Sequence, residues 1–305
     1  MLSRAVEDYL ALRRALGFKL IDTAELLRSF VAFAAARGEG SVQARTAIAW
    51  AARGTSIQRR RRRLRTIALF VEHLRAEDAS HEPIPTNLFP CRASSRHPPR
   101  IFSLEEIERV LALSASLWPT DSTRPITYRT LLGLLFTTGM RIGEALRLRV
   151  DDVDASGLTI RQTKFCKSRW LPLHVSTAEA LQHYLATRRG VISQSNRLFL
   201  SWRRRRPLGA EQVLRTFQAL CAEAGLDGAG GRRKPRLHDL RHSFAVHALR
   251  RCGVGRDAVE RHMLALSTYL GHVSVTSTYW YLEQTPQLMR DIADACDVWQ
   301  CGALS

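Results

Sequence analysis

Apolar residues in the first 80 positions recur every three or four residues, the spacing of amphipathic helices. Two such segments lie on either side of a break at Gly17-Phe18, and a third covers residues 42–52 with Trp50 on its apolar side. A fourth begins near Thr55-Ser56, residue types that suit a helix N-cap. The pattern predicts a helical domain over residues 1–82.

The periodic pattern then gives way to prolines, five of which fall within residues 83–100 and predict an extended linker. Ser103 and Glu106 have the spacing of a capping box that opens the next helix. From there to about residue 290 the pattern is helical, apart from two short strands over residues 158–163 and 169–173. The expected fold is therefore mainly α with a small β-hairpin, divided into a helical domain (1–82), a linker (83–100), a larger mixed domain (101–290) and a tail (291–305).

The formal net charge of +18 favours a polyanionic partner, with nucleic acid first. Only four of the 46 basic residues are lysines; a preference for arginine explains that ratio but not the shortage of acids. The basic residues cluster in one predicted helix and in three loops, where a merely solvated charge run is the alternative. The candidate DNA contacts are Arg59, Arg60, Arg61, Arg62, Arg63, Arg65, Lys167, Arg203, Arg204, Arg205, Arg232, Arg233 and Lys234.

Cysteine spacing and hydropathy narrow the protein class further. The six cysteines show neither a C-x-x-C pair nor a Cys/His ligand spacing, which argues against a zinc site and a disulfide framework. No apolar run reaches membrane-spanning length, and charged residues interrupt the N-terminus in a way unlike a signal peptide. We expect a protein of the reduced cytoplasm.

A helix predicted to follow Pro235 carries two residues suited to phosphate chemistry. Leu237 and Leu240 mark its buried face, while His238 and Arg241, three residues apart, lie one turn apart on one face. An imidazole moves protons near neutral pH, and a guanidinium fork fits a phosphate. His-x-x-Arg is a short and common pattern, so a solvated polar face is the alternative.

Arg141 follows a glycine break at Gly139 and precedes a new helical turn. Main-chain N–H groups at such a turn favour an anion beside the arginine. The alternative is a surface ion pair with Glu144, of small energetic value.

Lys164 and Lys167 lie in the turn between the two predicted strands. A lysine can release a proton when its surroundings lower its pKa, whereas arginine cannot, so one of these two lysines is the candidate general acid. Charge that keeps a hairpin tip soluble is the alternative.

A histidine and several tyrosines follow near the C-terminus. His272 is followed nine residues later by Tyr281, with Tyr279 and Tyr269 as competing candidates for a nucleophile. Each of these tyrosines could equally be a core or interface aromatic.

Together, and in this order, Arg141, Lys164, His238-x-x-Arg241, Leu-Gly-His272 and Tyr281 resemble the tyrosine recombinase (phage integrase) family. The resemblance covers residues 101–290, and by composition and position the N-terminal helices are similar to that family's core-binding domain. It selects Lys164 over Lys167 and Tyr281 over Tyr279, although Phe165-Cys166 stand where the family usually has a glycine. Trp280 and residues 265–270 resemble recombinases of bacterial insertion elements and transposons.

The resemblance implies DNA cleavage and rejoining through a 3′-phosphotyrosyl link, with no metal, ATP or other cofactor. Tyr281 would attack, Arg141 and Arg241 would hold the phosphate oxygens, and Lys164 would protonate the leaving 5′ oxygen. His238 would act as general base or acid, and His272 would donate a hydrogen bond to the phosphate. The implied partners are double-stranded DNA sites, further copies of the chain in a tetramer, and other recombinases of the same mobile element. The tail would dock on a neighbouring protomer or pack on its own domain. The bound protein would lie on the bacterial nucleoid.

Three other functions compete with this interpretation. A metal-dependent nuclease could use His238 and His242 with Asp151, Asp152 or Asp154, although those aspartates also suit the start of a helix after Arg149. A non-catalytic accessory protein could retain the same fold. A type IB topoisomerase shares the chemistry, but the separate N-terminal module favours site-specific recombination.

Overall fold

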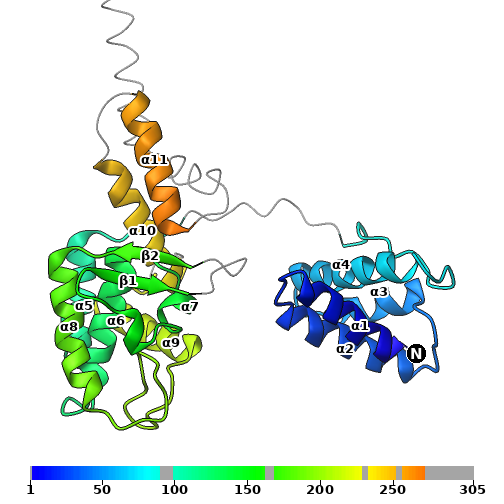
Figure 1. The fold of residues 1–305 in the computed structure, drawn as a ribbon, viewed down its shortest axis with the longest axis horizontal. Helices are drawn as coiled ribbons and strands as arrows, with labels where there is room; N and C mark the ends of the chain where they lie inside the picture. Colours follow the sequence, from blue (N-terminus) through cyan, green and yellow to red (C-terminus); the bar gives the residue numbers. More distant parts are fainter. Residues whose placement is uncertain (1, 90–98, 162–167, 229–232, 252–255, 272–305) are drawn as a thin grey trace, which may run out of the picture. The chain divides into compact units, whose positions relative to one another are not determined.

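The computed structural model describes residues 2–89, 99–161, 168–228, 233–251 and 256–271. The chain forms two compact units, Met1–Arg96 and His97–Ser305 (Figure 1). The prediction of a mainly helical fold with one small β-hairpin is confirmed. In the described part of the chain, no helix combines the length and apolar character that crossing a membrane would require.

The described residues of the N-terminal unit form four helices: α1 (Leu2–Ala15), α2 (Ile21–Ala35), α3 (Ala44–Ala52) and α4 (Ile57–Leu74). Ser56 is the N-cap of α4, as its residue type predicts, because its Oγ accepts a hydrogen bond from the N–H of Arg59 at 3.2 Å. Trp50 is buried at the centre, edge-to-face with Phe30 at a centroid distance of 5.5 Å.

Helix α6 lies at the centre of the C-terminal unit, where it packs against α5, α7, α8 and α10. The helices are α5 (Leu104–Ser114), α6 (Arg124–Thr138), α7 (Ile142–Ala145), α8 (Val175–Arg189), α9 (Ala210–Glu223), α10 (Leu237–Arg250) and α11 (Arg256–Leu270). The capping box of Ser103 and Glu106 opens α5 as predicted. Where a helix was expected after Arg149, a single 3-10 turn, Val150–Asp152, is found.

The hairpin consists of β1 (Gly157–Ile160) and β2 (Arg169–Pro172), which pair antiparallel with Ile160 opposite Arg169. The first strand begins one residue earlier and ends sooner than expected. On β2, the half-buried Arg169 and the buried Leu171 share the face toward the core, while Trp170 between them is exposed. The strand therefore carries an arginine at an inward-facing position.

Helix α10 contacts both the segment that precedes α5 and helix α11. Phe102 donates its N–H to Ser243 Oγ at 2.8 Å, and its carbonyl lies 2.8 Å from His247 Nε2. On the opposite side, Ala245 and Leu249 of α10 and Leu266 of α11 share a small apolar core.

Candidate active site

The site is built around a turn that only glycine adopts without strain. Gly139 ends α6 with φ +59° and donates its N–H to the carbonyl of Leu135. Arg141 then takes an extended conformation as the N-cap of α7, as its position after the glycine predicts. The turn sets the direction in which the Arg141 side chain leaves the main chain.

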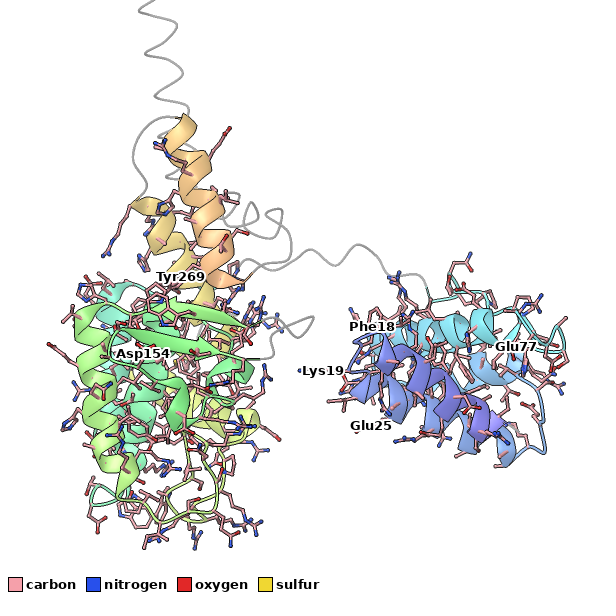
Figure 2. The ribbon with its side chains drawn as sticks, in the orientation of Figure 1. Phe18, Lys19, Glu25, Glu77, Asp154 and Tyr269 are labelled. Carbon is pink, nitrogen blue, oxygen red and sulfur yellow. The ribbon has the colours of Figure 1, made fainter. Side chains whose placement is uncertain are left out.

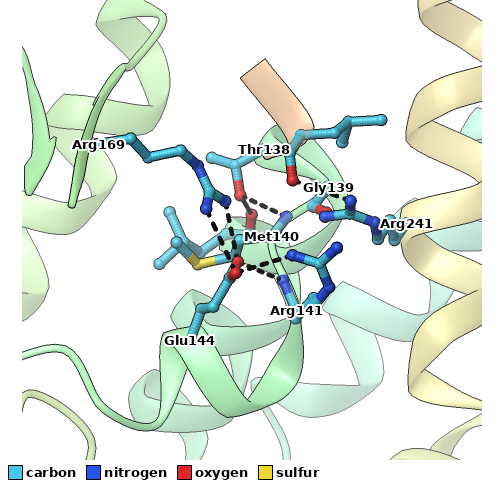
Figure 3. A network of polar contacts seen from close by, with 9 residues as sticks. Thr138, Gly139, Met140, Arg141, Glu144, Arg169 and Arg241 are labelled. Atoms are coloured by element: carbon cyan, nitrogen blue, oxygen red, sulfur yellow. Dashed lines mark hydrogen bonds and ion pairs between the residues drawn. The ribbon is translucent and has the colours of Figure 1, made fainter. Parts of the chain in front are cut away.

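Glu144 forms the centre of a polar network in this turn (Figure 3). Its Oε2 accepts from the main-chain N–H of Arg141 at 3.1 Å, and its Oε1 accepts from Arg141 Nη1 at 3.0 Å. Arg169 Nη2 donates to Glu144 Oε2 at 2.9 Å, from the neighbouring strand. The pair of Arg141 and Glu144 is therefore not the low-value surface interaction considered above, because the Glu144 side chain is only 3% exposed.

The pKa of Glu144 is lowered within this network. Burial raises the pKa of the carboxyl, but the hydrogen bond and charge of Arg169, together with those of Arg141, outweigh that effect. Glu144 is therefore ionised at neutral pH. Its negative charge restrains Arg141, whose own side chain stays 41% exposed and accessible to a ligand.

Arg241 is almost completely buried, at 1% exposure, so the alternative of a solvated polar face on α10 is wrong for this residue. Its Nη1 donates to the carbonyl of Gly139 at 2.7 Å, and its Nη2 donates to the carbonyl of Leu270 at 2.9 Å (Figure 3). One guanidinium thus ties the Gly139 turn and the end of α11 to α10. Arg241 comes to lie beside the turn that presents Arg141, although 100 residues separate the two in sequence.

His238 remains on the exposed side of α10, close to this cationic cluster. Packing around the imidazole and the charges of Arg241, Arg141 and Arg236 lower the pKa of His238 below its ordinary value. The imidazole is therefore neutral at physiological pH. A neutral imidazole can accept a proton from a nucleophile.

His242 lies one turn further along α10, with its ring 4.5 Å from that of His238 between centroids. Burial, followed by the nearby His238, Arg236 and Arg241, lowers the pKa of His242 to about 3. Among the described residues, no group of three His, Cys, Asp or Glu side chains has the arrangement of a metal site. Asp152 instead binds Arg161, and Asp154 accepts from Trp170 Nε1 at 3.0 Å.

We expect the buried His242 to make folding sensitive to mild acid. Between about pH 6.5 and 3, His242 is protonated in the unfolded chain but neutral in the folded protein. The unfolded state therefore binds more protons, and the free energy of unfolding falls as the pH falls. One such group changes the free energy of unfolding by at most about 1.4 kcal/mol per pH unit. Urea titrations between pH 7 and 5 should show that the free energy of unfolding falls less steeply for His242→Gln than for the wild type. Parallel pH slopes for the two proteins would refute the assignment. Glu144 does not interfere, because its lowered pKa confines its contribution to more acidic pH.

Tyr269 occupies a structural position and is a poor candidate for the nucleophile (Figure 2). Its hydroxyl donates to the carbonyl of Pro172 at 3.2 Å, and its ring stacks on Phe244. Burial raises the pKa of Tyr269 to about 12, which disfavours the phenolate. Lys164, Lys167, Arg232, His272, Tyr279 and Tyr281 lie outside the described residues.

The arginine run on α4 is only partly available to a ligand. Arg62 pairs with Asp22 at 2.6 Å, Arg60 donates to the carbonyl of Gly54, and Arg63 stacks 3.8 Å above the ring of Trp50. The remaining basic candidates of the described chain are exposed. These are Arg59, Arg61, Arg65, Arg203, Arg204, Arg205, Arg233 and Lys234.

Sequence reasoning gave Glu144 only a minor role and assigned none to Arg169. Arg169 appeared as an ordinary strand residue. The signal that could have identified it is the alternation of β2, which places this arginine on the same face as the buried Leu171. A charge at an inward position requires a buried partner.

The chain belongs to the phage integrase family, whose sequence profile matches residues 100–287. As a member of this family, the chain is a tyrosine-type site-specific recombinase.

Similar proteins match over most of the chain. The integrase/recombinase y4rB of Sinorhizobium fredii is 40% identical over 298 residues, which cover 94% of this chain and 94% of that protein. Tyrosine recombinase XerD of Corynebacterium glutamicum is 33% identical over 205 residues, 66% of this chain and 62% of its own.

Solved structures share the fold at lower identity. The XerH site-specific recombinase in its post-cleavage difH complex has a TM-score of 0.62 at 20% identity, covering 92% of this chain and 80% of that one. The Tn1549 transposon integrase in complex with transposon right end DNA has a TM-score of 0.61 at 17% identity, and the match covers 96% of this chain and 99% of that one.

Proposed function

We propose that this protein cleaves and rejoins DNA strands for a bacterial mobile element, with Tyr281 as the nucleophile. The observation that carries the proposal is the hydrogen bond between Arg241 and the carbonyl of Gly139, which brings the guanidinium of α10 beside the turn of Arg141. Two arginines from distant parts of the chain, with a neutral His238 near both, suit a phosphodiester whose negative charge increases during attack.

In the first step the Tyr281 oxygen bonds to the scissile phosphorus and the bond to the 5′ oxygen breaks. His238 accepts the phenol proton, and Lys164 supplies a proton to the departing 5′ oxygen. In the second step the 5′-hydroxyl of a partner strand attacks the phosphotyrosine and releases the enzyme. The ester conserves the bond energy, so the exchange needs neither ATP nor a metal ion.

The arginines stabilise charge during both steps. Arg141 and Arg241 hold the non-bridging oxygens, and His272 adds a hydrogen bond to them. Electrostatic stabilisation of this kind is commonly the largest contribution to catalysis, and an arginine fork matches a phosphate with two parallel donors. The exposed arginines of α4 and of the loops would contact the DNA backbone.

Joining two DNA sites requires more than one copy of the chain, and we propose a tetramer on DNA. Its C-terminal tail would contact a neighbouring protomer, and other recombinases of the same element are further candidate partners. The relatives' names as integrases and recombinases support the role in a mobile element. Such a protein would act in the cytoplasm, on the nucleoid.

The test uses a nicked suicide DNA that carries the element's own ends, with wild type and Tyr281→Phe compared in EDTA. We expect a covalent protein–DNA band from the wild type and none from the variant, because phenylalanine lacks the attacking oxygen. Tyr279→Phe is the matched control and should form the band.

The other outcomes separate the alternatives. A band that persists in Tyr281→Phe would move the nucleophile to another tyrosine. DNA binding without any band would favour the non-catalytic accessory protein. Cleavage that disappears in EDTA would favour the metal-dependent nuclease.

A further inference from the structure

Arg169 is the second cation on the buried carboxylate of the site. It enters from the inner face of β2, where its side chain is 15% exposed. Its two terminal nitrogens donate to the two oxygens of Glu144, Nη1 to Oε1 at 3.3 Å and Nη2 to Oε2 at 2.9 Å. Glu144 in turn contacts both the main chain and the guanidinium of Arg141. Arg169 therefore reaches Arg141 through one shared carboxylate.

The charges of this trio favour phosphate binding. One carboxylate with one arginine is neutral and would leave Arg141 little net attraction for a phosphate. With Arg169 present, the three side chains carry one net positive charge, and Glu144 is held by donors on two sides. Arg169 thus keeps the net charge around Arg141 positive. It also restrains the Glu144 carboxylate, which in turn orients Arg141.

Arg169 also lies against the corner that follows α11. Gly271 has φ +66°, and a Cβ there would come within 2.6 Å of Arg169 Nη1, so the guanidinium occupies the space of a side chain. The preceding carbonyl, that of Leu270, is held by Arg241. This corner is therefore fixed by two arginines, one residue before His272 in the sequence.

We propose that Arg169 is a positioning residue for strand transfer. Through Glu144 it orients Arg141 and keeps the net charge around Arg141 positive, and through its contact with Gly271 it supports the corner that precedes His272. The proposal rests on the recombinase function proposed above. Arg169 touches no reacting atom itself.

The experiment compares Arg169→Gln and Arg169→Lys with Arg161→Gln in the full-length protein. Arg161 is the matched control because it directly follows β1 and also pairs with a buried carboxylate in a short helical turn, that of Asp152. DNA affinity and single-turnover formation of the covalent complex are measured at saturating suicide DNA.

We expect Arg169→Gln to form the covalent complex about 10–100-fold more slowly, the range seen when a residue that orients a site ligand is removed. Its DNA affinity should stay within about threefold of wild type, since few of the charges that attract the DNA backbone are changed. Arg169→Lys should recover part of the rate, because it retains the charge without the fork. Arg161→Gln should resemble the wild type.

A double-variant cycle distinguishes positioning from general structural support. In an Arg141→Lys background, Arg169→Gln should slow formation of the covalent complex by at most about threefold, because the guanidinium that Arg169 orients is already absent. Equal fold losses in both backgrounds would overturn the proposal, as would a wild-type rate for Arg169→Gln.

Amide hydrogen exchange tests the network without relying on activity. Arg169→Gln should accelerate exchange in residues 139–144 and 268–271, and Arg161→Gln should not. Unchanged exchange in those residues would overturn the positioning role. If the wild type formed no Tyr281-dependent complex, the proposed function would fail, and the exchange result would still decide the role of Arg169.

Discussion

Arg241→Lys should slow covalent complex formation by about 10²–10³-fold, the loss that follows removal of one preorganised donor from an active site. The buried guanidinium spans two carbonyls, those of Gly139 and Leu270, with separate nitrogens. A lysine ammonium is a compact point charge and cannot reproduce this fork. An unsatisfied buried carbonyl costs about 1–3 kcal/mol, so the free energy of unfolding should fall by a similar amount.

Single-turnover cleavage and urea unfolding measure the two effects of Arg241→Lys. The control is Arg250→Lys in the last turn of the same helix, where the arginine is exposed and the substitution should change neither quantity. Wild-type cleavage by Arg241→Lys would contradict the assignment of this arginine to the phosphate.

Gly139→Ala should destabilise the protein by about 2–6 kcal/mol, of which about half is backbone strain and half is overpacking. A Cβ at this position would lie 2.4 Å from Phe244 Cδ1 and 2.9 Å from Leu270 Cδ2. Relief of that overlap requires α10 or α11 to move away from the turn. Cleavage should fall as well, because the same shift lengthens the hydrogen bond from Arg241.

Gly225→Ala separates the two contributions, since Gly225 also has a positive φ of +72° but nothing within 4 Å of a Cβ. Gly225→Ala should lower the free energy of unfolding only by the cost of backbone strain, about 1–3 kcal/mol, and should leave DNA cleavage unchanged. Urea unfolding that gave equal losses for the two variants would show that the contacts with Phe244 and Leu270 relax without cost.

The sequence predicted the elements that local patterns determine. The N-cap Ser56, the capping box of Ser103 and the start of α10 after Pro235 depend on residues close in sequence, and the structure contains all three. The position of Arg141 at the start of a helical turn follows in the same way from Gly139. Such signals act over a few residues, so they can be recognised without knowledge of the fold.

Features that depend on distant contacts were not predictable in this way. Helical spacing places His238 and Arg241 on one face, but it cannot show that only Arg241 is buried, because the residues that cover it belong to other segments. The second partner of Glu144 comes from β2, 25 residues later. The arginines of α4 likewise appear equivalent in sequence, whereas Arg62 and Arg63 have partners in α2 and α3.

The two hydrogen bonds at Phe102 have a mechanical consequence. Both main-chain groups of this residue are held by side chains of α10, those of Ser243 and His247, within two turns of Arg241. A pull on the chain at Phe102 is therefore carried to α10 through these two bonds, alongside the bonds that Arg100 makes to Glu106 of α5 and to the carbonyl of Leu226. Tension on the described chain at Phe102 would therefore act on the helix that carries His238 and Arg241.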